Sequence, residues 1–276
     1  MQHVNWDYRP TLIDPIAFVA YSGWNDGGES ASSAVEHLID VLGAEQVAAI
    51  DHEEFADFQV TRPMVVLDEE GMRSVQWPET GVFVASTAGQ DIVLILGEEP
   101  RLRWKAYSRV VAGVLKDLEV NRVVTFGAFL GQVAHTADPP IVGVASPEVK
   151  REHDLLSSSY EGPTGIVGVL TAELVDYGFD VTSLWAASPH YLAGTDNPKA
   201  ARALLAKSEK VFGLELGSFT LDEAVDDWER RVEEAVTDND DLQDYVERLQ
   251  EVHTEIEGTG GRLVEEIEQF LRDDDE

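Results

Sequence analysis

The feature that most constrains the fold is the stretch at residues 15–42, where a short apolar run ends at a glycine-rich turn and an amphipathic pattern begins. The run at residues 16–21 is bounded by Pro15 and Gly23, which predicts a buried strand. The apolar residues that follow recur at intervals of three and four, which predicts a helix: Ala31, Ala34, Val35, Leu38, Ile39 and Leu42. The stretch therefore predicts a strand–turn–helix unit of the kind from which α/β folds are built.

The same alternation continues along the chain. Apolar runs predict further strands at residues 46–50, 64–67, 73–77, 81–86, 91–96, 122–126, 141–145 and 180–187, with a turn at residues 127–131. Amphipathic patterns predict helices at residues 101–118 and 166–177, and one that starts at Asn197-Pro198. We therefore expect an α/β fold with helices on both faces of the sheet. Because residues 64–86 are rich in strands, the sheet should be mixed and largely parallel.

The negative charge is concentrated near the C-terminus. The 276 residues have a formal net charge of −33, and residues 215–276 contain 23 acidic residues against five arginines. This change of composition predicts an α/β core domain at residues 1–214 and an acidic helical extension at residues 215–276. Apolar residues at intervals of three and four from Leu242 to Ile256 predict a packed helix, and a final helix is expected at residues 263–271.

Composition excludes several kinds of partner and chemistry. Nucleic acid and anionic membranes would be repelled by the net charge, so we expect neither as a partner. The chain contains no cysteine, which removes disulfides, thiolate catalysis and cysteine-bound metals. The first residues lack the pattern of a signal peptide, and no apolar run reaches membrane-spanning length. We therefore expect a cytoplasmic protein.

Polar residues gather in the segments that follow the predicted strands. Loops at residues 23–29, 97–101, 127–136 and 188–197 leave strands at their carboxyl ends, where open α/β sheets bind ligands. Together with the helix start at residues 160–165 they predict a candidate binding pocket without an assigned reaction. Its polar residues are Asn25, Asp26, Glu29, Glu99, Arg101, His135, Thr136, Glu161, Thr164 and His190.

Motifs that would assign chemistry to these loops are missing from the sequence. The turn at residues 23–28 has neither the lysine of a P-loop nor the glycine spacing of a dinucleotide fingerprint. We favour a tight turn in which Asn25 or Asp26 caps the next helix, a contribution of about 1 kcal/mol. His135 and His190 have no partners at ligand spacing, so we predict structural, hydrogen-bonded histidines and expect neither a metal nor a cofactor.

Five strings in the sequence carry a family resemblance. They are GWNDGGESASSAVEHL, FADFQVTRP, LGEEPRLRW, SSYEGPTGIVGVL and SLWAASPHYLAGTDNPKA, which begin at residues 23, 55, 96, 158 and 183. In this order they resemble the proteasome assembly chaperone 2-like family, and more narrowly its actinobacterial branch, over about residues 14–212. The resemblance implies a mixed α/β fold similar to the phosphorylase/hydrolase class, homo-oligomers, and kinship with chaperones that help to assemble the 20S proteasome.

Two classes of function remain open. The resemblance and the lack of a complete catalytic constellation favour a non-enzymatic protein-binding or assembly factor, with proteasome subunits as partners. The chain ends in LRDDDE, unlike the hydrophobic-tyrosine-x tails of the family's chaperones, so docking through the tail is not implied. The alternative is a small-molecule-binding protein or an enzyme, of phosphorylase/hydrolase-like or ligase type, that uses the strand-end loops.

Overall fold

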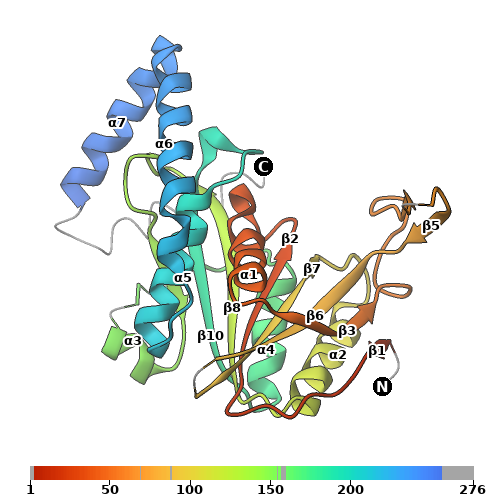
Figure 1. Ribbon diagram of the computed structural model, residues 1–276. Helices are drawn as coiled ribbons and strands as arrows, with labels where there is room; N and C mark the ends of the chain where they lie inside the picture. Colours follow the sequence, from red (N-terminus) through yellow and green to blue (C-terminus); the bar gives the residue numbers. More distant parts are fainter. Residues whose placement is uncertain (1–2, 69, 88, 154, 157–159, 257–276) are drawn as a thin grey trace.

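An eight-stranded sheet forms the centre of the computed structural model, which describes residues 3–68, 70–87, 89–153, 155–156 and 160–256 (Figure 1). The strands are β1 (Val4–Trp6), β2 (Ile16–Ser22), β3 (Glu45–Asp51), β4 (Met64–Leu67), β5 (Arg73–Gln76), β6 (Glu79–Ser86), β7 (Asp91–Glu98), β8 (Arg122–Gly131), β9 (Ile141–Val144) and β10 (Asp180–Pro189). The helices are α1 (Ser30–Val41), α2 (Trp104–Asp117), α3 (Pro147–His153), α4 (Ile166–Asp176), α5 (Pro198–Phe212), α6 (Asp222–Thr237) and α7 (Asp240–Ile256).

The strands lie in the order β1-β3-β6-β7-β2-β8-β10-β9, and β4 and β5 form a separate two-stranded sheet. Strands β7, β2, β8 and β10 are parallel neighbours, whereas every other pairing in the large sheet is antiparallel. The predicted mixed sheet is therefore confirmed. Because the four central strands point the same way, their carboxyl ends share one side of the sheet, which we call the strand-end edge.

Helices cover both faces of this sheet, as predicted (Figure 1). The residues of β2 alternate between the two cores. Ala17, Val19 and Tyr21 pack with residues of α2 and α4, whereas Ile16, Phe18 and Ala20 pack with residues of α1 and α5. A continuous apolar run is what a central strand buried on both faces requires.

The prediction of a turn at residues 127–131 is wrong, because strand β8 continues through these residues to Gly131. These residues pair in parallel register with Trp185 to Pro189 of β10. A Cβ at Gly127 would lie 2.5 Å from the ring of Trp185, so this glycine lets the indole pack across the strand. Strand β1 and helix α3 were not predicted; they have three and seven residues, too few for a periodic pattern to identify them.

Helices α6 and α7 form a helical hairpin, which we call the arm (Figure 1). The arm packs on the core through buried apolar residues around Ala134, namely Trp228, Val232, Val236, Val246 and Leu249. The helix predicted from Leu242 is α7, whereas the one expected at residues 263–271 lies outside the described residues. In the part of the chain that the structure describes, no helix combines the length and apolar character needed to cross a bilayer.

Candidate functional site

The strand-end edge brings together the four loops that the sequence predicted to meet. Strands β7, β2, β8 and β10 are adjacent and parallel, so the segments that follow them emerge side by side. The predicted site residues on these segments separate into two hydrogen-bonded clusters, with Asn25, Asp26 and His135 buried, and a set of exposed side chains that join neither.

The first cluster is centred on the carboxylate of Glu99, which follows β7. Its Oε1 accepts a hydrogen bond from Nδ2 of Asn25 at 2.7 Å and another from the backbone N–H of Ile166 at 2.8 Å. Because Ile166 is the first residue of α4, Glu99 places a negative group at the positive end of that helix. One carboxylate from a different loop thus serves as the helix cap.

Gly165 allows the three segments to approach this closely. A Cβ at this position would lie 2.4 Å from Oδ1 of Asn25 and 2.6 Å from Oε1 of Glu99. Asn25 is fully buried, its carbonyl accepts a hydrogen bond from the N–H of Ala128, and its Oδ1 has no hydrogen-bond partner among the described residues. The cluster is therefore tightly packed, with one amide oxygen left unsatisfied.

Asp26 caps helix α1, the role that the sequence predicted for it or for Asn25. Its Oδ1 accepts hydrogen bonds from the N–H groups of Ala31 at 2.7 Å and Ser32 at 3.2 Å, and its Oδ2 accepts one from Oγ of Ser32. Burial raises the pKa of Asp26, and these hydrogen bonds oppose the rise. The side chain is fully used in holding the start of α1.

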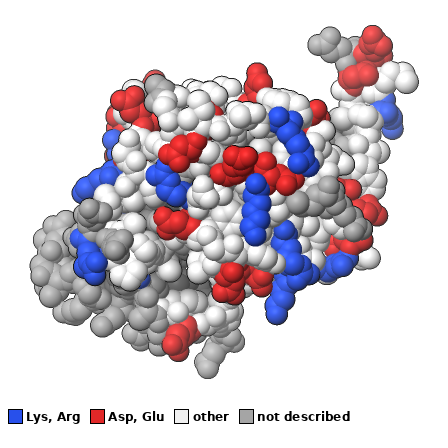
Figure 2. All heavy atoms as spheres, turned by 90° about the horizontal axis from the view of Figure 1, so that it is seen from below, with Lys and Arg blue, Asp and Glu red and all other residues white. Residues whose placement is uncertain are grey.

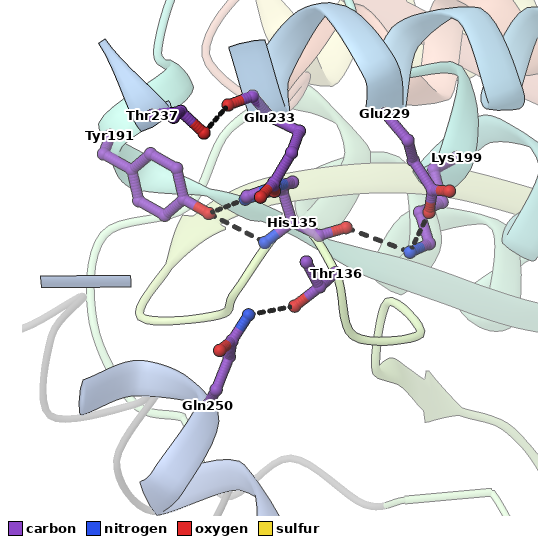
Figure 3. A network of polar contacts seen from close by, with 8 residues as sticks. All are labelled: His135, Thr136, Tyr191, Lys199, Glu229, Glu233, Thr237 and Gln250. Atoms are coloured by element: carbon purple, nitrogen blue, oxygen red, sulfur yellow. Dashed lines mark hydrogen bonds and ion pairs between the residues drawn. The ribbon is translucent and has the colours of Figure 1, made fainter. Parts of the chain in front are cut away.

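The second cluster surrounds His135, in the loop after β8, and the arm covers it (Figure 3). The hydroxyl of Tyr191 accepts a hydrogen bond from the N–H of His135 at 2.7 Å and lies 2.8 Å from its Nδ1. Nε2 of the same ring lies 3.1 Å from Oε2 of Glu233 in α6. This arrangement suits a neutral ring in which Nδ1 accepts from Tyr191 and Nε2–H donates to Glu233.

The electrostatics of the cluster favour this neutral form. Burial lowers the pKa of His135, and the hydrogen bond to Glu233 opposes the lowering without reversing it. Burial also raises the pKa of Tyr191 to about 12, so its hydroxyl keeps its proton. Both groups therefore act as fixed hydrogen-bonding partners near neutral pH.

Further contacts fasten the arm to the same loops. Nζ of Lys199 donates to the carbonyl of His135 at 2.9 Å and pairs with Glu229 of α6 at 2.5 Å (Figure 3). From α7, Nε2 of Gln250 donates to Oγ1 of Thr136 at 2.9 Å, and the hydroxyl of Tyr245 lies 3.3 Å from Nε2 of His190. The other ring nitrogen of His190 lies 3.2 Å from the carbonyl of Gly131. The arm thus closes the part of the edge formed by β8 and β10.

The remaining predicted residues, Glu29, Arg101, Glu161 and Thr164, are exposed. Across the described ranges, none of their side chains forms a hydrogen bond or ion pair with another predicted site residue. A groove of about 580 Å³ lies elsewhere, between α1, the start of α5, and α6, and no predicted site residue lines it. Within the described residues, no three His, Asp or Glu side chains are grouped so as to hold a metal ion.

Sequence reasoning missed several residues that complete the two clusters, namely Tyr191, Gly165, and Glu233 and Tyr245 of the arm. Tyr191 follows His190 directly and Tyr245 lies in the predicted periodic helix, so both stood near predicted features. Glu233 is 98 positions from His135, and no local pattern connects them. Gly165 was the easiest of these residues to find from the sequence, because a glycine directly before a predicted helix indicates a place where other segments can approach the helix start closely.

Comparison with known proteins identifies the family to which the chain belongs. The model described as PAC2 family matches residues 20–236. The chain belongs to the PAC2 family. This confirms the resemblance, and the match runs past residue 214 to include nearly all of α6.

Several solved structures resemble the chain over most of its length. A PAC2 family protein from Streptomyces avermitilis is 40% identical, with a TM-score of 0.79, and the match covers 84% of this chain and all of that one. A proteasome-assembly chaperone homologue from Mycobacterium tuberculosis is 35% identical, with a TM-score of 0.76, over 84% of this chain and 99% of its own. An archaeal proteasome activator from Pyrococcus furiosus, PbaB, shares the fold, at 20% identity and a TM-score of 0.65, over 84% of this chain and 97% of its own. A comparison with curated proteins found no match.

Proposed function

We propose that this PAC2 protein is a non-enzymatic protein-binding factor that takes part in proteasome assembly, with proteasome subunits as its partners. The observation that carries the proposal is that the buried polar side chains at the strand-end edge already form hydrogen bonds within the chain. Glu99 is bound to Asn25 and to the backbone of Ile166, and His135 lies beneath the arm. The buried polar groups, which an α/β enzyme would present to a substrate, hold the chain together here, whereas Glu29, Arg101, Glu161 and Thr164 are exposed and join neither cluster.

The relatives give the proposal its direction. The Mycobacterium tuberculosis relative, 35% identical, is a proteasome-assembly chaperone homologue, and the Pyrococcus furiosus protein of the same fold is a proteasome activator. We also expect this chain to act in the cytoplasm as a homo-oligomer.

Co-purification tests the partner. The full chain, tagged and expressed in its own organism, should retain proteasome subunits that mass spectrometry identifies. Because a protein with a net charge of −33 attracts basic proteins unspecifically, the wash should be repeated at high salt, which screens such contacts. Loss of every proteasome subunit at high salt would contradict the proposal.

A second function has one observation in its favour, the buried Oδ1 of Asn25 without a hydrogen-bond partner among the described residues. A buried acceptor of this kind is costly, and a ligand that donates to it would relieve the cost. A thermal-shift screen with nucleotides, nucleosides and carboxylates tests this alternative. A ligand whose stabilising effect disappears in Asn25→Ala would support small-molecule binding over the assembly role.

A further inference from the structure

The turn after β2 carries an exposed tryptophan on a fixed backbone. Trp24 is 59% exposed. Its two neighbours are both held against Glu99, because a Cβ at Gly23 would lie 3.2 Å from Cβ of Glu99 and Asn25 donates a hydrogen bond to the same carboxylate. Tryptophan is the residue type most typical of the centre of a protein–protein contact. A large aromatic side chain thus stays in solvent on a turn that is already in place.

The segment that follows β7 lies beside this turn. Strands β2 and β7 are parallel neighbours, and the N–H of Glu99 donates to the carbonyl of Ser22 at 2.9 Å. A little further along, Leu102 is 48% exposed, and its N–H donates to the carbonyl of Phe55 at 2.9 Å. A second exposed apolar side chain therefore lies on an anchored segment next to the turn of Trp24.

This segment is basic in a strongly acidic chain. Residues 100–109 contain four exposed cations, Arg101, Arg103, Lys105 and Arg109, and no acidic residue, although the whole chain has 53 acidic and 20 basic residues. Arg103 pairs with Glu54. Across the described ranges the other three cations form no ion pair. Their charges are therefore available to a partner.

The opposite edge of the sheet shows the contrast. There Arg122 pairs with Asp14 at 2.9 Å, and Arg9 pairs with Asp117 at 3.1 Å. Figure 2 views the protein from that side and shows basic side chains next to acidic ones. The three cations after β7 therefore differ from those at the other end of the strands.

The basic residues also oppose the stability of α2. The N-terminus of a helix carries a positive partial charge, so acidic side chains stabilise the first turn and basic ones destabilise it. The first turn of α2 has no acidic residue; it contains Lys105, and Arg103 occupies the N-cap position. Because a local rule that is broken without compensation is typical of functional sites, these cations indicate a role other than folding.

We propose that Trp24, Leu102, Arg101, Lys105 and Arg109 form a docking surface for an acidic segment of a proteasome subunit, one that carries an apolar residue beside its carboxylates. The inference rests on the proposed function and adds the surface that binds and the chemistry of the segment that is bound. The indole and Leu102 contact the apolar residue, and the cations bind the carboxylates. Since the net charge of −33 repels an acidic segment from most of the protein, this surface is where such a segment can approach.

Binding of separately purified proteasome subunits to the full chain tests the apolar part of the surface. Trp24→Ala should weaken binding at least about tenfold and leave the urea midpoint unchanged, because the side chain is exposed. Phe219→Ala is the matched control. It also removes an exposed aromatic side chain, which is 70% exposed on a different segment, and should leave binding unchanged.

Lys105→Glu tests the charges. Binding should weaken several-fold, because the new carboxylate repels the acidic segment. The urea midpoint should stay the same or rise, because an acidic residue suits the start of α2. Arg73→Glu, on the exposed strand β5, makes the same change in net charge and should leave binding unchanged. A residue that only supported the fold would not weaken binding while stability is kept.

Oxidative footprinting locates the contact in the natural chain. Hydroxyl radicals oxidise exposed indoles, and mass spectrometry measures the extent at each tryptophan. Trp24 should be protected when a proteasome subunit is bound. Trp77, which is 53% exposed and lies after β5, is the internal control and should react equally in the free and bound chain.

Three outcomes would overturn the inference. If the natural chain, Trp24→Ala and Lys105→Glu bind subunits equally well, the docking surface is wrong and the proposed function stands. If Trp24→Ala lowers the mass of the protein in sedimentation equilibrium, the surface belongs to a contact with a second copy of the chain. If the natural chain binds no proteasome subunit, the proposed function fails and this inference fails with it.

Discussion

Nδ2 of Asn25 lies 2.7 Å from Oε1 of Glu99, although the two residues are 74 positions apart in the chain. Asn25 follows β2 and Glu99 follows β7, and these strands are parallel neighbours. The same carboxylate oxygen accepts the first backbone N–H of α4. One side chain thus joins three segments at the edge where an α/β enzyme would hold its substrate.

Replacing Glu99 with alanine should destabilise the fold. The substitution leaves two donors without their acceptor, the Asn25 amide and the Ile166 N–H, and each buried donor left unpaired costs about 1–3 kcal/mol. Urea unfolding measures the loss. The neighbouring Glu98 is exposed, so Glu98→Ala is the matched control and should change the free energy of unfolding little. Equal losses in the two variants would contradict the capping role of Glu99.

Gly165→Ala should be destabilising because the new methyl group overlaps Asn25 and Glu99. Overpacking of this kind typically costs about 1–3 kcal/mol. Gly131→Ala is the control, since the nearest atom to a Cβ there lies 3.5 Å away, an ordinary contact distance. Chemical denaturation of both variants checks the prediction, and equal stability would show that the first cluster is more loosely packed than described.

Acid should weaken the fold partly through His135. Burial lowers its pKa, so the unfolded chain takes up a proton that the folded chain resists. The free energy of unfolding should then fall as the pH drops through about 6.5, the ordinary pKa of histidine. His52 contributes in the same direction, because burial lowers its pKa as well.

The variant His135→Gln isolates this effect. Its stability should decline less between about pH 7.5 and pH 5.5 than that of the natural chain, with the part due to His52 remaining. Urea midpoints at the two pH values give the comparison. An identical decline in both proteins would show that His135 does not titrate differently on folding.

Trp228→Ala should release the arm from the core. The indole is buried, and its N–H has no hydrogen-bond partner among the described residues. The substitution therefore removes packing contacts alone, and it should lower the free energy of unfolding by about 3 kcal/mol. Hydrogen exchange should accelerate in α6 and α7 more than in β2. Phe219→Ala is the control, since Phe219 is 70% exposed. Equal acceleration in β2 and α7 would mean that arm and core unfold as one unit.

The sequence predicted the strands and helices that carry strong local patterns. The apolar run of β2, the N-cap of α5 at Asn197 and the capping role of Asp26 could all be read locally. The extension of β8 beyond residue 126 could not be read locally, because a glycine such as Gly127 most often marks a turn. Its actual role depends on Trp185, a residue 58 positions away.

The candidate site was predicted as one pocket, and the fold divides its residues. Parallel strands brought the loops to one edge, as expected, yet the edge is filled by contacts that no local pattern encodes. His135 meets Glu233 only because the arm folds back over the loop after β8. Whether Asn25, Glu99 and their neighbours bind a ligand stays a prediction.

The rate of proteasome assembly is the most direct test of the proposed function. Separately purified proteasome subunits of the same organism should be mixed with and without the full chain, and the growth of the assembled particle followed on native gels and by peptidase activity. We expect the chain to bind an assembly intermediate and to speed its conversion into the active particle. An unchanged rate, with no subunit bound to the chain at any stage, would contradict an assembly role.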